Sequence, residues 1–224
     1  MSQPGGQLLA AVQTMDRLRS PGGCPWDAEQ THRSLAPYLM EEAYETLEAI
    51  ELDDLTALRE ELGDLLLQVL FHARLAEEAA AEQRFDIDDV AADLVAKLTR
   101  RHPHVFGDQP AADAEAVAVN WEQLKQAEKQ RSSVTDGIAF GQPALALAAK
   151  LVSRSGRAGL PVEPPAGPGI GERLLALVGE AVADGLDPEQ ELRRAARDYA
   201  EQIRQAEQVR QAEQAEQLRQ AEAG

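Results

Sequence analysis

Residues 39–50 read LMEEAYETLEAI, and residues 60–70 read EELGDLLLQVL. In both stretches the apolar residues recur every three or four positions, which is the period of an amphipathic helix. On a helical wheel, each helix places two carboxylates at the edge of its apolar stripe, and the two pairs lie at matching angles. These carboxylates are Glu42 and Glu45 on the first helix, and Glu61 and Asp64 on the second. An antiparallel hairpin that turns at residues 52–54 is therefore expected to gather these carboxylates around one polar hole.

Two explanations of this pattern are open. Carboxylates three residues apart are common on the solvated faces of helices. Two pairs at matching angles on consecutive helices favour a site instead, and four clustered carboxylates without a counterion would raise one another's pKa values. A ligand set of oxygen atoms alone favours Mg²⁺, with Mn²⁺ as the alternative. The pattern therefore predicts a site for a hard divalent cation.

The rest of the chain continues the helical pattern. Good helix formers dominate, and no segment shows the sustained alternation of a strand, so the predicted class is all-α. A Pro/Gly-rich stretch, GLPVEPPAGPGIG, interrupts the pattern at 159–171. We expect one helical domain over 1–131, a connector and linker over 132–171, and a helical region with a QAE-rich tail over 172–224.

Local signals place the helices of the first domain. Helices are expected over 1–20, 34–51, 55–80, 86–101 and 114–131. Asp53 and Asp54 are placed to cap the start of the third of these. Pro103 disfavours the helical conformation of the residue before it, so the fourth should end near Arg101.

Composition narrows the range of partners. The chain has 39 acidic and 22 basic residues and a formal net charge of −17, which disfavours binding to nucleic acids and to anionic membranes. It has no apolar run long enough to span a bilayer and no signal-peptide pattern at its start. Its single cysteine, Cys24, cannot form an internal disulfide. These features predict a cytoplasmic protein.

Several motifs, in order, resemble one enzyme family. Glu41-Glu42-x-x-Glu45, followed after fifteen residues by Glu61-x-x-Asp64, is similar to the EExxE…ExxD motif of the all-α nucleoside triphosphate pyrophosphohydrolases. GCPWDAEQTH before it, and KLTRRHPHVFGD and NWEQLKQAEK after it, resemble the MazG branch of that superfamily. The resemblance covers about residues 8–162. It implies a helical bundle that hydrolyses nucleoside triphosphates between the α- and β-phosphates.

The resemblance also implies roles for individual residues. Glu42, Glu45, Glu61 and Asp64 correspond to the metal ligands, and Glu41 to a residue that orients a ligand or the attacking water. The substrate-binding set implied by the family motifs is Lys97 and Arg101 for phosphate, Trp121 for stacking on the base, and Lys125 for phosphate. Trp26 and its neighbours Asp27, Gln30 and His32 either line the same pocket or serve to cap and pack the loop.

Three further interpretations concern the whole protein. KLVSRSGRAGLPV (150–162) resembles the start of a second MazG repeat, but no second EExxE follows, so we expect a degenerate C-terminal repeat that supports assembly. The Leu-rich faces of two long helices favour a homodimer or a higher homo-oligomer. The expected role is housecleaning, the removal of non-standard or surplus nucleotides, and the motifs fix neither base nor sugar.

Two alternatives to this function are open. One is an acidic, helical partner-binding protein whose metal site is only structural and whose QAE-rich tail makes the contact. The other is a hydrolase of a different phosphate compound, such as a phosphoribosyl nucleotide. The combination of Lys97, Arg101, Trp121 and Lys125 favours the enzyme, because a structural metal site does not need these side chains.

Overall fold

A computed structural model describes residues 5–107, 113, 117, 133–160, 162–163 and 167–222. Throughout these residues the chain forms helices and turns without any strand, so the predicted all-α class is confirmed. The chain divides into two compact units, Met1–Lys125 and Gln126–Gly224. None of the helices in the described part combines the length and hydropathy that a membrane span requires.

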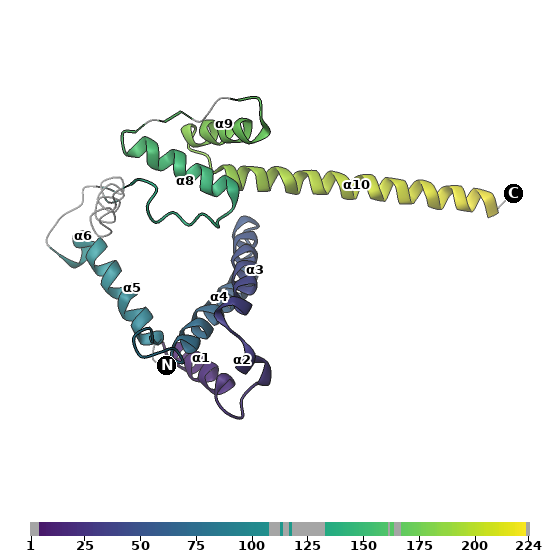
Figure 1. Ribbon diagram of the computed structural model, residues 1–224. Helices are drawn as coiled ribbons and strands as arrows, with labels where there is room; N and C mark the ends of the chain where they lie inside the picture. Colours follow the sequence, from purple (N-terminus) through teal and green to yellow (C-terminus); the bar gives the residue numbers. More distant parts are fainter. Residues whose placement is uncertain are drawn as a thin grey trace. The chain divides into compact units, whose positions relative to one another are not determined.

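The first unit is built around one long helical hairpin (Figure 1). Its helices are α1 (Gly6–Arg19), α2 (Pro25–Glu29), α3 (His32–Glu51), α4 (Leu55–Ala76), α5 (Ile87–Arg101) and α6 (Pro103–Phe106). The predicted helices at 34–51 and 86–101 appear within two residues of their expected bounds. The predicted helix at 55–80 ends four residues early, and the one at 114–131 lies outside the described residues except for position 117.

Side-chain caps define the hairpin. Thr31 and Ser34 form a reciprocal capping box at the start of α3. The chain leaves α3 through Asp53, which has a positive φ of 54°. Asp54 then accepts hydrogen bonds from the backbone N–H groups of Thr56 and Ala57, which lack partners within the first turn of α4. The predicted capping of this helix is therefore confirmed, and the cap fixes where the antiparallel return begins.

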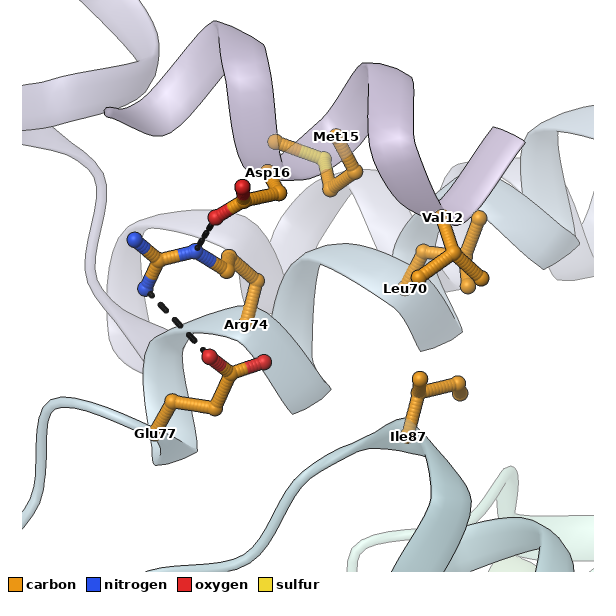
Figure 2. A pocket seen from close by; sticks show the side chains of 7 residues that line it. All are labelled: Val12, Met15, Asp16, Leu70, Arg74, Glu77 and Ile87. Atoms are coloured by element: carbon orange, nitrogen blue, oxygen red, sulfur yellow. Dashed lines mark hydrogen bonds and ion pairs between the residues drawn. The ribbon is translucent and has the colours of Figure 1, made fainter. Parts of the chain in front are cut away.

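The hydrophobic core lies where α1 packs on α3 and α4. Its buried members are Met15, Leu35, Leu70, Phe71 and Leu75. Figure 2 shows the edge of this core, where Val12 and Met15 of α1 meet Leu70 of α4 and Ile87 of α5 around a small cavity. Beside it, the Arg74 guanidinium on α4 lies 2.9 Å from the Asp16 carboxylate on α1. These contacts join α1 firmly to the half of the hairpin farthest from its turn.

The second unit contains α8 (Ala144–Arg157), α9 (Ile170–Ala183) and α10 (Pro188–Glu222). Helices α8 and α9 pack on each other, and the start of α10 contacts both. Arg154 is buried and donates from one guanidinium nitrogen to the carbonyl oxygens of Val134 and Asp136. The predicted QAE-rich tail is helical and solvent-exposed, and it forms the far end of α10.

Candidate active site

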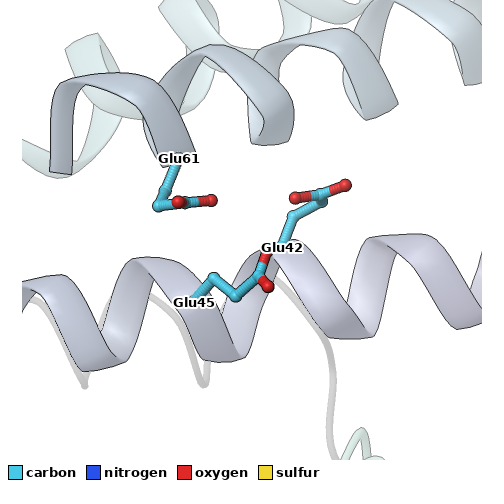
Figure 3. A group of neighbouring side chains, drawn as sticks. All are labelled: Glu42, Glu45 and Glu61. Atoms are coloured by element: carbon cyan, nitrogen blue, oxygen red, sulfur yellow. The ribbon is translucent and has the colours of Figure 1, made fainter. Parts of the chain in front are cut away.

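The hairpin of α3 and α4 brings carboxylates from both helices together. One oxygen from each of Glu42, Glu45 and Glu61 lies within 4.8 Å of the others. Glu42 and Glu45 occupy consecutive turns of α3, and Glu61 reaches towards them from α4 (Figure 3). The structure thus places side by side three of the four carboxylates that the helical wheel selects.

Asp64 faces the same space. It is half-buried and lies three residues after Glu61 on α4, which is nearly one helical turn. It is not part of the group within 4.8 Å, but its charge raises the pKa values of both Glu42 and Glu61. A charge effect on carboxyls of both helices places Asp64 at the same polar gap.

The carboxylates disturb one another electrostatically. The pKa of Glu42 is raised above its ordinary value of 4.5, first by partial burial and then by the charges of Asp64, Glu45, Glu61 and Glu41. The pKa of Glu61 is raised as well, first by partial burial and then by the charges of Glu45, Asp64 and Glu60. Like charges held this close destabilise the site at neutral pH unless a cation offsets them.

The donor set fits a hard divalent cation. All the clustered ligand atoms are carboxylate oxygens, which Mg²⁺ and Mn²⁺ prefer. Because one oxygen of each of the three carboxylates lies within 4.8 Å of the others, the group could hold such an ion between α3 and α4.

Comparison with known proteins agrees with this geometry. A family model described as the MazG nucleotide pyrophosphohydrolase domain matches residues 30–106, which contain all four carboxylates. A Thermotoga maritima protein named nucleoside triphosphate pyrophosphohydrolase/pyrophosphatase MazG is 37% identical, over 92% of this chain and 87% of that protein. The chain belongs to the MazG family.

Other relatives define how much of a MazG protein the chain represents. A 26.1 kDa protein of Streptomyces cacaoi is 54% identical, over 91% of this chain and 84% of its own length. A nucleoside triphosphate pyrophosphohydrolase of Mycobacterium tuberculosis is 45% identical, over 92% of this chain. The match covers 59% of the mycobacterial protein, so the chain corresponds to only part of that longer MazG relative.

Glu41 lies beside the MazG carboxylates. It is exposed on α3, and its charge is the smallest of the causes that raise the pKa of Glu42. Glu41 therefore borders the polar gap without belonging to the group of three.

Trp26 packs at the far end of the same hairpin. Its ring meets Tyr38 edge-on with centroids 6.1 Å apart, and Phe71 edge-on with centroids 6.4 Å apart. Tyr38 lies one turn before Glu42 on α3, so the ring on which Trp26 packs is one helical turn from the carboxylates. Half of its surface stays exposed. Trp26 thus combines a packed edge with an accessible ring.

The neighbours of Trp26 serve the loop itself. The Gln30 amide donates to the Trp26 carbonyl oxygen at 2.9 Å and accepts from the Ser34 hydroxyl at 2.7 Å. The backbone carbonyl of Asp27, itself buried, accepts a hydrogen bond from Arg19. For Gln30, these contacts agree with the alternative in which the residues near Trp26 cap and pack the loop and do not line the substrate pocket.

The cations of the MazG motif lie on α5. Lys97 and Arg101 are one turn apart, with Lys97 exposed and Arg101 buried. Within the described part of the chain, Lys97 makes no ion pair with the carboxylates of α3 and α4. Trp121 and Lys125 lie outside the described residues.

Gln68 is a polar residue of the hairpin to which the family motif assigns no role. It lies one turn beyond Asp64 on α4, is 4% exposed, and its Oε1 atom has no hydrogen-bond partner. The sequence held a signal, because Gln68 interrupts the otherwise apolar run LLLQVL at 65–70.

Proposed function

We propose that the protein hydrolyses nucleoside triphosphates to nucleoside monophosphate and pyrophosphate with Mg²⁺, for which Mn²⁺ can substitute. The observation that carries this proposal is the meeting of Glu42, Glu45 and Glu61 from two helices within 4.8 Å. Membership of the MazG family supports it. The raised pKa values of Glu42 and Glu61 add that the arrangement is suited to a bound cation.

The four carboxylates would hold the ion. Glu42 and Glu45 would bind it from α3, and Glu61 and Asp64 from α4. When bound, a divalent cation offsets the charge of the triphosphate and lowers the pKa of water in the site. The rigid hairpin keeps the donor groups in place before substrate arrives, which reduces the reorganisation that the reaction requires.

Other side chains would position the reactants. Glu41, at the border of the gap, is assigned to orienting the attacking water. If water attacks the α-phosphorus, the bond from that phosphorus to the bridging oxygen breaks and pyrophosphate leaves. If water attacks the β-phosphorus, the bond from the β-phosphorus to the same oxygen breaks and nucleoside monophosphate leaves. In both cases the proton lost by the water passes to a base. Lys97, Arg101 and Lys125 are assigned to the phosphates and Trp121 to stacking on the base.

The biological role proposed is housecleaning in the cytoplasm, the removal of non-standard or surplus nucleotides. A base held mainly by stacking is read with little selectivity, so a broad substrate range is expected. The net charge of −17 makes nucleic acid an unfavourable partner.

A homodimer is proposed for the first unit. The hairpin leaves several large apolar side chains exposed on its two helices: Met40, Ile50, Leu55, Leu62, Leu67 and Val69. Burying such side chains against a second copy is favourable. Gel filtration with light scattering tests this, and a monomer at micromolar concentration contradicts it.

The second unit is proposed to be a degenerate MazG repeat that supports assembly, with catalysis confined to residues 1–131. In this division 132–171 is the connector, and 172–224 forms the remainder of the repeat and the tail. In the described residues, the one group of three or more potential metal ligands lies on α3 and α4 of the first unit.

Product analysis tests the reaction. The purified protein is incubated with Mg²⁺ and a panel of ribo- and deoxyribonucleoside triphosphates, and pyrophosphate is measured against orthophosphate. Glu42→Gln and Glu61→Gln should each lower pyrophosphate release by more than the roughly 10- to 100-fold typical of losing an outer-shell partner. Glu48→Gln, an exposed position on α3, is the matched control and should keep the wild-type rate.

The same assay separates the alternative functions. Release of orthophosphate, or activity on phosphoribosyl nucleotides alone, would show that the site acts on a different phosphate compound or a different bond. A folded protein that binds Mg²⁺ and releases no product would support the partner-binding alternative, in which the carboxylates are structural and the QAE-rich tail makes the contact.

A further inference from the structure

The side chain of Gln68 is buried at an energetic cost. Its exposed fraction is 4%, and its Oε1 atom lacks a hydrogen-bond partner. Leaving a buried polar group unpaired destabilises a folded protein, and folded proteins pair the large majority of such groups. A leucine or methionine would fill the same place in the run LLLQVL without this cost. A hydrogen-bond donor from outside the chain would remove this cost.

The position of Gln68 follows from the pairing of the two helices. Glu42 on α3 meets Glu61 on α4, and Asp64 follows Glu61 by nearly one turn along the same face of α4. One layer further from the turn comes Gln68, and beyond it Leu35 and Phe71 share the hydrophobic core. Gln68 therefore lies between the metal-binding carboxylates and the closed core.

The two ends of the carboxylate site differ in chemistry. Towards the hairpin turn the chain carries Glu51, Asp53 and Asp54, which repel an anionic substrate. At the opposite end, Trp26 and Tyr38 pack edge-on and leave 50% and 42% of their surfaces exposed. A nucleoside triphosphate with its phosphates at the carboxylates is therefore expected to point its nucleoside towards the aromatic end.

We propose that Gln68 is a specificity-determining residue that accepts a hydrogen bond from the nucleoside part of the substrate, beside the aromatic pair of Trp26 and Tyr38. This inference rests on the proposed function. The unpaired Oε1 atom requires a donor, which a nucleoside supplies as a base N–H or a sugar hydroxyl. Binding of the nucleoside would satisfy the amide that folding leaves unpaired.

The experiment compares the Gln68→Met variant with the wild-type protein, each as the 224-residue chain. Methionine keeps the length and flexibility of glutamine and removes the amide. Gln142→Met is the matched control, because Gln142 also has a buried, unpartnered amide atom and lies in the other unit. Three quantities are measured for each protein: kcat and KM for the nucleotide panel, the Ki of inorganic tripolyphosphate as competitor, and Tm.

The expected results separate the nucleoside from the phosphates. Gln68→Met should lower kcat/KM by about 10-fold or more for substrates whose nucleoside donates the hydrogen bond. The Ki of tripolyphosphate, which has no nucleoside, should change less than twofold. The Tm should stay the same or rise, because an unpaired buried group is lost. Comparing ribo- with deoxyribonucleotides, and bases with and without an amino group, identifies the donor.

Several outcomes would overturn the inference. An unchanged KM across the panel removes Gln68 from recognition, and a parallel rise in the Ki of tripolyphosphate moves it to the phosphates or the metal. A lower Tm with an equal loss for all substrates makes its role structural. If the wild-type protein hydrolyses no nucleotide, binding of nucleotide and of tripolyphosphate with Mg²⁺ is measured instead. If Gln68→Met then binds nucleotide more weakly than the wild-type protein but binds tripolyphosphate equally well, the inference stands although the proposed reaction fails. If the two proteins bind nucleotide equally well, the inference fails together with the proposed reaction.

Discussion

The imidazole rings of His32 and His72 meet edge to edge, with nearly parallel planes, between the start of α3 and the end of α4. Their centroids are 5.1 Å apart, their planes differ by 3°, and their Nδ1 atoms are 2.8 Å apart. A hydrogen bond between two Nδ1 atoms requires one donor and one acceptor, so at least one ring must be neutral. Burial, and then the neighbouring His32, lower the pKa of His72 below its ordinary value of 6.5.

This pair predicts a pH-dependent stability. Because the folded protein holds the His72 proton less tightly than the unfolded chain, stability is complete above pH 6.5 and is lost as the pH falls through the lower folded pKa. His72→Phe keeps a flat aromatic ring without a titratable nitrogen, so it should reduce this dependence. It should also lose about 1 kcal/mol at pH 7.5 with the hydrogen bond. Urea unfolding between pH 5 and 7.5 measures both effects. His104→Phe is the control, and an equal reduction in that variant would refute the assignment.

Metal binding should stabilise the fold through Glu42. In metal-free buffer, Glu42→Gln is expected to raise Tm, because a raised carboxyl pKa means that stability is lost as the pH rises above 4.5 towards neutrality. Wild-type protein should gain about 2.7 kcal/mol at a Mg²⁺ concentration 100 times the dissociation constant. The variant should lose most of this gain. Thermal unfolding with EDTA and with Mg²⁺ tests both, with Glu48→Gln as control; a full metal response in Glu42→Gln contradicts the site.

The ion pair of Arg19 and Glu78 should hold α1 to the end of α4. The guanidinium donates to both carboxylate oxygens, at 2.8 and 2.9 Å, and the Arg19 side chain is only 7% exposed. Arg19→Lys cannot make the two-point contact and should cost about 1–2 kcal/mol. Chemical denaturation measures this loss, and Arg33→Lys, at an exposed position, should leave stability unchanged. The pKa of Glu78 is lowered mainly by its hydrogen bond with Arg19, so this contribution should disappear as the pH falls below 4.5.

The turn of the hairpin offers two opposite effects at adjacent positions. Asp54→Ala removes the cap of α4 and should cost about 1 kcal/mol. Asp53→Gly relieves a side chain with a positive φ of 54° and should stabilise the fold by a few tenths to about 1 kcal/mol. Denaturant midpoints measure both. Destabilisation by Asp53→Gly would show that its side chain has a structural role of its own.

Sequence periodicity predicted the hairpin well because local signals define it. The end of α3 at Glu51, the cap at Asp54 and the end of α5 at Arg101 each depend on residues within a few positions. The wheel angles of Glu42, Glu45 and Glu61 follow from helical geometry alone, so their meeting needed only the assumption of an antiparallel return.

Features that depend on tertiary contacts were missed. The Ala- and Glu-rich stretch after Ala76 favours continued helix, but α4 ends there, and Glu78 pairs with Arg19 from a distant part of the chain. The edge-on packing of Trp26 on Tyr38 and Phe71 also joins separate segments. The roles of Lys97, Arg101, Trp121 and Lys125 stay predictions, because they depend on groups that only a bound nucleotide brings together.

Helix α10 has a consequence for how unfolding is observed. Its residues from 201 to 214 are all exposed, and the ion pair there, between Arg204 and Glu201, joins residues only three positions apart on the helix (Figure 1). An isolated helix of this kind melts gradually with temperature, because only local interactions hold it. Far-UV circular dichroism should therefore record a gradual loss of helix before the cooperative transition. The fluorescence of Trp26, which packs on Tyr38 and Phe71 of the hairpin, should report that transition without the gradual phase.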